Sequence, residues 1–179
     1  MITKQNYDDV MTNMAKMVET TFNAENMMNI SVTLSVFEDT EDAANWPDVT
    51  NQKDGYGNMD WKKIYDNQRN KSKHFMLSVH SSENHQNLAM LFAGHVSAND
   101  DDGSCVSLDY IERNSEAVEL KGYAIVLAIK FAYVLAELIS FKRVKVNNPA
   151  RGLGSIYQKE MPNSEWVQYG KTNYIHAEL

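Results

Sequence analysis

The chain has 179 residues, a formal net charge of −7 and a pI near 5.2. Its 43% hydrophobic and 23% charged residues are typical of one soluble domain with a sizeable core, which excludes collagen-like and wholly disordered proteins. A single cysteine, Cys105, excludes a disulfide framework and a multi-cysteine zinc site, and without an apolar leader at the amino terminus it favours a cytoplasmic protein.

The charge is divided unevenly along the chain. Residues 1–60 contain 11 acidic and 3 basic residues, and residues 61–179 contain 13 acidic and 14 basic residues. No basic field is available to attract a phosphate backbone, which argues against general nucleic-acid binding. The acidic first third could attract a cationic amine or a basic protein, or it could serve solubility alone.

The first 73 residues predict a helix, a strand and a long polar segment. Apolar residues recur at three- and four-residue steps, which predicts an amphipathic helix over about residues 5–22. Its expected apolar face consists of Tyr7, Val10, Met11, Met14, Met17, Val18 and Phe22. Alternation over residues 29–38 predicts a strand. The polar stretch 39–73 contains one short helical run, and polar segments of this length are often binding loops or lids.

The middle of the chain predicts a three-stranded meander and a long helix. Residues 74–80, 88–98 and 105–112 alternate like strands and are separated by short, polar, hairpin-like connectors. The apolar run from Gly122 to about Ser140 must be weighed as a membrane span. Four charged residues fall within roughly 60° of arc on one helix, which indicates a buried helix with a narrow wet stripe instead. They are Glu116, Glu119, Lys130 and Glu137.

The last 40 residues predict a strand, a helix and a closing strand. Residues 142–146 form a short strand pattern. Asn148 and Pro149 are typical of a helix start, and Pro162 would stop that helix at about Met161. Residues 166–176 have the composition of a closing strand.

The run from Cys105 to Met161 resembles the cofactor-binding core of the GNAT N-acetyltransferases. In that family a strand leads into a loop of the form Gln/Arg-x-x-Gly-x-Gly/Ala, and the loop caps a long helix. A strand and a shorter helix that carries a tyrosine then follow. Here residues 106–112 match the strand, residues 119–124 match the loop, and Tyr157 has the place of the tyrosine.

The resemblance implies a fold of the α/β (α+β) class, with a mixed, mostly antiparallel central sheet flanked by helices. It implies a single domain over residues 1–179, in which the amino-terminal helix is an addition. The polar segment 39–73 then falls on the acceptor side of the site.

The resemblance also implies acetyl-CoA as the cofactor. Backbone N–H groups at a helix N-terminus bind a pyrophosphate well, and glycine or alanine lets the phosphate approach closely. Two positions differ from the family, because Glu119 stands in place of Gln or Arg and Ala150 in place of an asparagine. The expected cofactor-binding residues are Tyr110, Ile111, Glu119, Lys121, Gly122, Tyr123, Ala124 and Asn148.

The implied reaction is transfer of an acetyl group to a primary amine. The amine must lose a proton, so a carboxylate at the strand end would serve as general base, with Glu112 preferred over Asp109. Tyr157 would give a proton to the leaving thiolate. Backbone N–H groups near Tyr110 and Ile111 would polarise the thioester carbonyl. The same residues also have ordinary interpretations, as edge carboxylates and a packing tyrosine.

The acceptor would be a cationic amine, of a small molecule or of a protein, bound against the polar segment. The expected acceptor-binding residues are Glu38, Asp39, Trp46, Trp61 and Tyr65. Packing aromatics and a solvated acidic turn are the alternative explanation. The histidines show no metal-ligand spacing, so no metal site is expected.

Two other functions remain open at this point. The chain could be a catalytically inactive GNAT-fold interaction or regulatory protein, for example one encoded by a phage, that binds a basic partner through its acidic amino-terminal third. Glu119 favours that view, whereas Gly122, Ala124 and Tyr157 favour the enzyme. A toxin that acetylates aminoacyl-tRNA is disfavoured by the net charge of −7. Self-association is possible under each of these.

Overall fold

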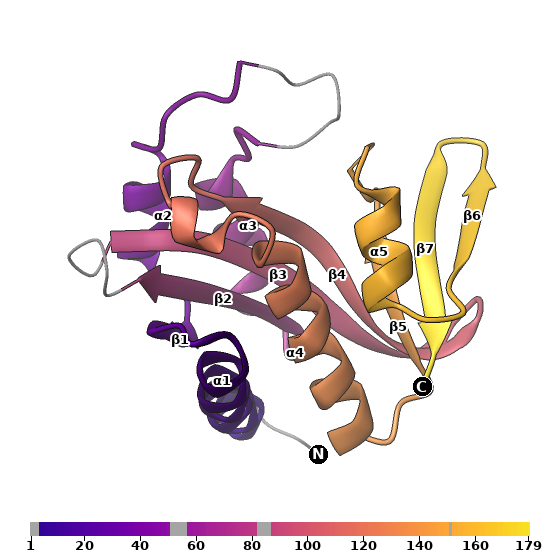
Figure 1. Cartoon of the computed structure of the whole chain (residues 1–179). Helices are drawn as coiled ribbons and strands as arrows, with labels where there is room; N and C mark the ends of the chain where they lie inside the picture. Colours follow the sequence, from indigo (N-terminus) through magenta and orange to yellow (C-terminus); the bar gives the residue numbers. More distant parts are fainter. Residues whose placement is uncertain (1–3, 51–56, 82–86, 151) are drawn as a thin grey trace.

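A computed structural model describes residues 4–50, 57–81, 87–150 and 152–179 (Figure 1). The elements in chain order are α1 (Lys4–Asn26), β1 (Ile30–Leu34), α2 (Phe37–Ala43), α3 (Trp61–Gln68), β2 (His74–Ser81), β3 (Asn87–Asp100), β4 (Gly103–Arg113), the 3₁₀ helix η2 (Val118–Leu120), α4 (Ala124–Leu138), β5 (Arg143–Asn147), α5 (Gly154–Glu160), β6 (Glu165–Tyr169) and β7 (Thr172–Glu178).

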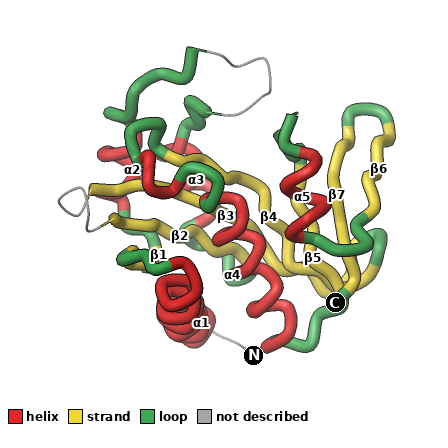
Figure 2. Tube along the Cα trace, viewed as in Figure 1, coloured by secondary structure: helices red, strands yellow, loops and turns green. Residues whose placement is uncertain are grey.

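The strands form one seven-stranded sheet with the order β1-β2-β3-β4-β5-β7-β6. Neighbouring strands are antiparallel except β4 and β5, which run parallel from Cys105↔Arg143 to Leu108↔Val146. Helices lie on the sheet as Figure 2 shows. The expected mixed, mostly antiparallel sheet flanked by helices is therefore confirmed.

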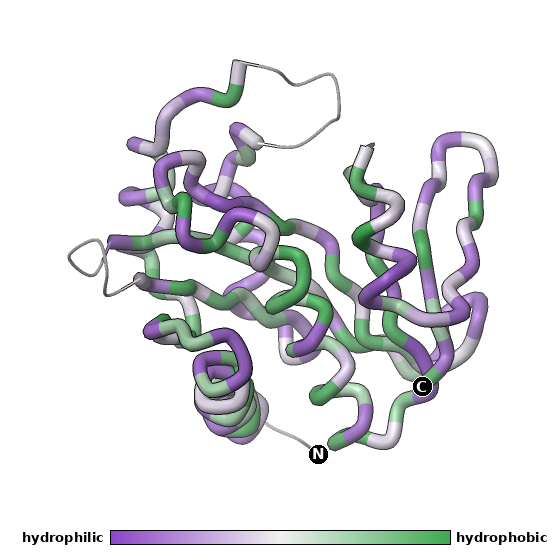
Figure 3. The backbone as a smooth tube through the Cα atoms, viewed as in Figure 1, coloured by the Kyte–Doolittle hydropathy of each residue, from purple (hydrophilic) through white to green (hydrophobic). Residues whose placement is uncertain are grey.

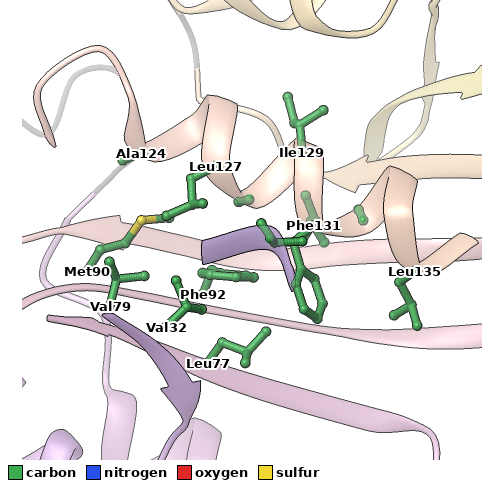
Figure 4. Packing of buried hydrophobic residues seen from close by; sticks show 14 of the residues in the cluster. Val32, Leu77, Val79, Met90, Phe92, Ala124, Leu127, Ile129, Phe131 and Leu135 are labelled. Carbon is green, nitrogen blue, oxygen red and sulfur yellow. The ribbon is translucent and has the colours of Figure 1, made fainter. Parts of the chain in front are cut away.

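One face of the sheet is covered by α1, α4 and α5, and this layer contains the main core. Phe131 of α4 is fully buried and packs against Phe75 and Phe92, with ring centroids 5.4 and 5.5 Å apart (Figure 4). The hydropathy of α4 is seen in Figure 3. The opposite face has a smaller cluster under α2 and α3, and this cluster includes Trp61 and Leu91.

The long helix α4 is the buried central helix that its apolar run predicted. Its charged stripe is used for packing, because Lys130 forms an ion pair with Glu25 of α1. The helix ends in a Schellman motif at Ser140, whose φ is 57°, with Phe141 N–H donating to Ala136 O. In the described part of the chain, no helix has both the length and the hydropathy that a bilayer span requires.

The amino-terminal expectations were wrong in part. Helix α1 is longer than residues 5–22, and Val10 and Met17, assigned to its apolar face, are 37% and 48% exposed. The strand ends at Leu34 instead of continuing to residue 38. The Asp39 carboxylate accepts a hydrogen bond from Val36 N–H at 2.9 Å, and this local capping bond starts α2 where alternation suggested a strand.

Two carboxy-terminal expectations were also wrong. The helix predicted over residues 148–161 begins only at Gly154, because Asn148 has a φ of 45° and its N–H donates to Asn173 O at 2.7 Å. A residue that precedes proline is also disfavoured in the helical region. The predicted closing strand is a hairpin, in which Gly170, with a φ of 57°, turns the chain between β6 and β7.

Candidate functional site

The parallel strands β4 and β5 separate in the middle of the sheet. Their pairing ends at Leu108↔Val146, although β4 continues to Arg113 alongside β3. The register between β3 and β4 shifts at this point, since Ala93 pairs with Tyr110 and Gly94 with Leu108. Asp109 is therefore an extra, bulged residue, and such bulges bend a strand and redirect its side chains.

A cleft of about 450 Å³ follows the opening between the two strands. Its walls are the end of β4, the start of α4, and α5 with the segment before it, seen at the right of centre in Figure 1. A hollow of about 40 Å³ adjoins it and shares Ile111, Ala150 and Tyr157 with it. The cleft is lined by Val49, Gly57, Ile111, Glu112, Arg113, Ser115, Lys121, Gly122, Ala124, Ile125, Ala150, Leu153, Ile156 and Tyr157.

The amino-terminal end of α4 forms one wall of this cleft. The first-turn N–H groups of a helix have no carbonyl acceptor within it, and they carry partial positive charge. Gly122 precedes the helix with a φ of 84°, and a Cβ placed on it would have no atom within 4 Å. Lys121 and Arg113 add two cationic side chains to the lining. The arrangement can hold a phosphate group.

Two residues expected to bind the cofactor point elsewhere. Glu119 lies on η2 and lines a separate hollow of about 200 Å³ with Glu116 and Asn114. The Tyr123 ring packs edge-on against Phe22 of α1, with ring centroids 6.2 Å apart. The 3₁₀ turn buries Leu120 and directs Glu119 away from the cleft, so this carboxylate does not oppose an anion there.

Arg113 is a functional candidate that the sequence did not single out. Its Nη1 donates hydrogen bonds to the carbonyls of Asn114, Ser115 and Ala117, at 2.8 to 3.2 Å. The guanidinium therefore shapes the loop that leads to α4. Its position directly after the β4 strand residues that match the family was the available signal.

Glu112 is the anchor of the segment that precedes α3. Its carboxylate accepts hydrogen bonds from Asn58 N–H at 2.6 Å, Met59 N–H at 3.2 Å and Trp61 Nε1 at 2.6 Å. Glu112 is 8% exposed and Trp61 is 2% exposed. With both oxygens bonded to N–H donors, this carboxylate is better placed to hold the cleft wall than to accept a proton from a substrate.

Asp109 lies at the wall of the 40 Å³ hollow, together with Tyr110 and Asn147. Its Oδ1 accepts a hydrogen bond from Asn147 Nδ2 at 2.6 Å, and its Oδ2 lies 2.6 Å from His95 Nδ1. Asn148, also an expected cofactor residue, lines the same hollow. The bulge thus brings a carboxylate to the point where the strands separate.

Tyr157 lies between the cleft and the hollow. It is 3% exposed, and burial raises the pKa of its phenol above the ordinary value, while a hydrogen bond from the Ala150 backbone partly offsets this. The group is therefore held in its protonated form at neutral pH. A buried phenol in this state can donate a proton to an anionic leaving group.

The structure does not bring the expected acceptor residues together at the cleft. Asp39 is buried and accepts a hydrogen bond from Ser78 Oγ at 2.6 Å. Trp46 packs on the small cluster under α2 and α3, and Tyr65 lines a separate hollow of about 120 Å³ at the start of β2. Glu38 is exposed on α2. Part of the expected acceptor segment, residues 51–56, lies outside the described residues.

Other residues border the opening on its acceptor side. Met59, Tyr110 and Asn147 line the 40 Å³ hollow, and Val49 and Gly57 reach the larger cleft. Among the described ranges, no three metal-ligating side chains gather into a metal site.

Comparisons with known proteins identify the fold. No family model and no curated protein matches the sequence. The PaiA N-acetyltransferase of Thermoplasma acidophilum, solved with coenzyme A, superposes with a TM-score of 0.56 at 11% identity, covering 85% of this chain and 100% of its own. AtaTR bound with acetyl-CoA gives 0.57 at 7% identity, covering 84% and 93%. Spermidine N-acetyltransferase SpeG of Vibrio cholerae gives 0.53 at 9%, covering 83% and 93%.

At these low identities the likeness concerns architecture. The chain has the fold of the GNAT N-acetyltransferases, as its resemblance to that family predicted.

Proposed function

We propose that this protein is an N-acetyltransferase that moves an acetyl group from acetyl-CoA to a primary amine. One observation carries the proposal: the gap between β4 and β5, the amino-terminal end of α4 and the buried Tyr157 all border one cleft of about 450 Å³. A strand opening, an anion-binding helix end and a proton donor are the three parts that transfer from a phosphorylated thioester requires.

The residues of the cleft fit coenzyme A. The free N–H groups at the start of α4 suit its pyrophosphate, and the open position beside Gly122 lets phosphate approach the backbone. Lys121 and Arg113 supply positive charge, and Leu153 and Ile156 supply an apolar wall for the pantetheine arm. Acetyl-CoA would supply the activated acetyl group at the strand opening.

The chain's own residues account for the protons of the reaction. An ammonium acceptor gives up two protons as it becomes an amide: one ends on the leaving sulfur and the other enters the solvent. Tyr157 protonates the sulfur as the carbon–sulfur bond breaks, and it regains a proton from the amine nitrogen. Backbone N–H groups of the separated part of β4, near Tyr110 and Ile111, polarise the carbonyl.

The acceptor that we infer is a cationic amine. Asp109 places a carboxylate in the hollow next to the opening. Solved relatives by fold include a spermidine N-acetyltransferase. The alternative function, an inactive interaction protein, drew its support from Glu119, and that side chain lines a different hollow.

Calorimetric titration with acetyl-CoA tests the cofactor site. We expect a dissociation constant in the micromolar range for the wild-type protein. Gly122→Glu should weaken binding at least about 100-fold, because a charged side chain would enter the phosphate position. Gly170→Glu is the matched control, since Gly170 also has a positive φ and open space around its Cβ but lies in the remote β6–β7 turn. Equal affinity in Gly122→Glu, or no wild-type binding at millimolar acetyl-CoA, would contradict the proposal.

Turnover of Tyr157→Phe tests the proton donor. We expect kcat to fall by about 10² or more, with the acetyl-CoA dissociation constant changed less than about threefold, because the hydroxyl acts on the leaving group. Unchanged kcat would remove Tyr157 from the reaction.

A further inference from the structure

A histidine lies against the bulged carboxylate of β4, outside the walls of the cleft. His95 Nδ1 is 2.6 Å from Asp109 Oδ2. The other oxygen of Asp109 accepts hydrogen bonds from Asn147 Nδ2 at 2.6 Å and from Ser107 Oγ at 3.0 Å. These contacts fix the carboxylate at the hollow where β4 and β5 separate, and they fix the imidazole against it.

The hydrogen bond decides which ring nitrogen of His95 can exchange a proton. An ionised carboxylate can only accept, so Nδ1 carries the hydrogen, and Nε2 is left as the nitrogen with a lone pair. The His95 side chain is 32% exposed, which is enough for water to reach it. Its ring stacks on His74, with centroids 5.4 Å apart and planes at 24°, so its orientation is held from a second side.

The charges around the stacked rings favour a proton on His95. The hydrogen bond with Asp109 raises the pKa of His95 above its ordinary value, against the opposing effect of burial. Burial lowers the pKa of His74, and the charge on His95 lowers it further. The charged groups that act on the two rings, besides each other, are Asp100, Asp109, Lys145, Lys71 and Lys4.

We propose that the Asp109–His95 couple is the proton acceptor for the amine in the transfer step, an inference that rests on the proposed function. As the ammonium N–H bond breaks, the electron pair stays on nitrogen, which becomes the nucleophile. The proton bonds to His95 Nε2, directly or through one water. The Asp109 carboxylate stabilises the imidazolium that forms, and His95 then returns the proton to solvent.

This assignment divides the roles of the two carboxylates at the end of β4. Glu112 has three N–H donors and holds the cleft wall. Asp109 orients an imidazole, whose ordinary pKa lies near the pH at which a general base works best.

The test is the pH dependence of acetyl transfer between pH 6 and 9, followed by release of the coenzyme A thiol. The acceptor is the fastest of three probes: spermidine, tyramine and a lysine-containing peptide. We expect wild-type kcat/KM for the amine to rise and then level off once the couple has lost its proton. In His95→Gln it should keep rising across the range, because only the free amine then reacts. The rate loss should be about 10² at pH 7.5 and should shrink as the pH increases.

Two further variants separate this role from a structural one. Asp109→Asn should reach its plateau at a lower pH than the wild type, because the imidazole loses the carboxylate that favours its proton. His80→Gln is the matched control, since His80 Nε2 lies 3.3 Å from Asp39 on the same face of the sheet but away from the opening. It should keep the wild-type profile. Acetyl-CoA affinity of His95→Gln should stay within about twofold, because His95 does not line the cleft.

The outcomes are distinguishable. A plateau retained in His95→Gln, with turnover near the wild-type value, would overturn the proton-acceptor role and leave the proposed function standing. Failure of the wild-type protein to acetylate any of the three amines would overturn the proposed function, and this inference with it.

Discussion

The two faces of the sheet differ in what they do with polar residues. The face under α1, α4 and α5 is a continuous apolar layer that includes fully buried Leu77, Phe92 and Phe131. The face under α2 and α3 has a smaller apolar cluster and carries buried or half-buried His95, Asp109 and Glu112, each hydrogen-bonded. The first face supplies the hydrophobic stabilisation, and the second supplies oriented polar groups.

The comparison teaches where chemistry can be placed in this fold. Strand residues alternate between the faces, so β4 contributes Val106 and Leu108 to the core while Ser107 and Asp109 lie on the polar side. The bulge at Asp109 occurs where β5 leaves β4. A rigid apolar layer therefore supports the opening from one side, and reactive groups reach it from the other.

The largest effect is expected from a cavity in the apolar face. Phe131→Ala removes a fully buried ring that contacts Phe75 and Phe92, and should lower the free energy of unfolding by about 3–5 kcal/mol in urea denaturation. Val118→Ala, at a side chain that is 69% exposed, is the control and should change it by less than about 0.5 kcal/mol. Equal effects of the two variants would break the comparison between the faces.

An intermediate effect is expected from the anchor on the polar face. Glu112→Gln replaces one acceptor oxygen by an NH₂ group, which cannot accept from the three N–H donors. The unfolding free energy should fall by about 2–3 kcal/mol. Acetyl-CoA affinity should fall as well, because the anchored segment reaches the cleft through Gly57. Glu116→Gln, at an exposed carboxylate, should change neither quantity, and a wild-type result for Glu112→Gln would show that the anchor is dispensable.

A smaller, pH-dependent effect is expected at Asp39. Burial alone would raise the pKa of this carboxyl, but hydrogen bonds from His80, Ser78 and the Val36 N–H hold it below its ordinary value. A carboxyl with a lowered pKa in the folded state stabilises the protein above its unfolded pKa, and this contribution disappears as the pH falls through the folded value. Asp39→Asn should therefore cost about 1–2 kcal/mol at pH 7 and progressively less below about pH 4.

Stability measured from pH 7 down to pH 3 checks this expectation, with Asp42→Asn on the exposed side of the same helix as the control. A difference between Asp39→Asn and the wild type that stays constant across the range would contradict the assignment of this hydrogen-bonded carboxylate.

The candidate site was predictable in its loop and its tyrosine. Gly122, Ala124 and Tyr157 were expected from their order along the chain, and all three line the cleft. Asp109 was expected at the strand end, but its place in a bulge depends on a register shift in the pairing with β3. His95 carried no local signal, because its partner lies 14 residues away on the next strand. Glu119 was placed by loop spacing alone, and the turn of η2 directs it elsewhere.

The sequence by itself determined the elements whose residues carry their own period. The apolar run of α4 and the alternation of β2, β3 and β4 require burial on a helix and on strand faces whatever surrounds them. Only the tertiary structure decided which polar groups act together. Hydrogen bonds such as Glu112 with Trp61, 51 residues apart, form between distant segments, and their partners are fixed by packing and register. That is why the fold could be inferred from patterns, whereas the roles of Glu112, Asp109 and His95 follow from contacts.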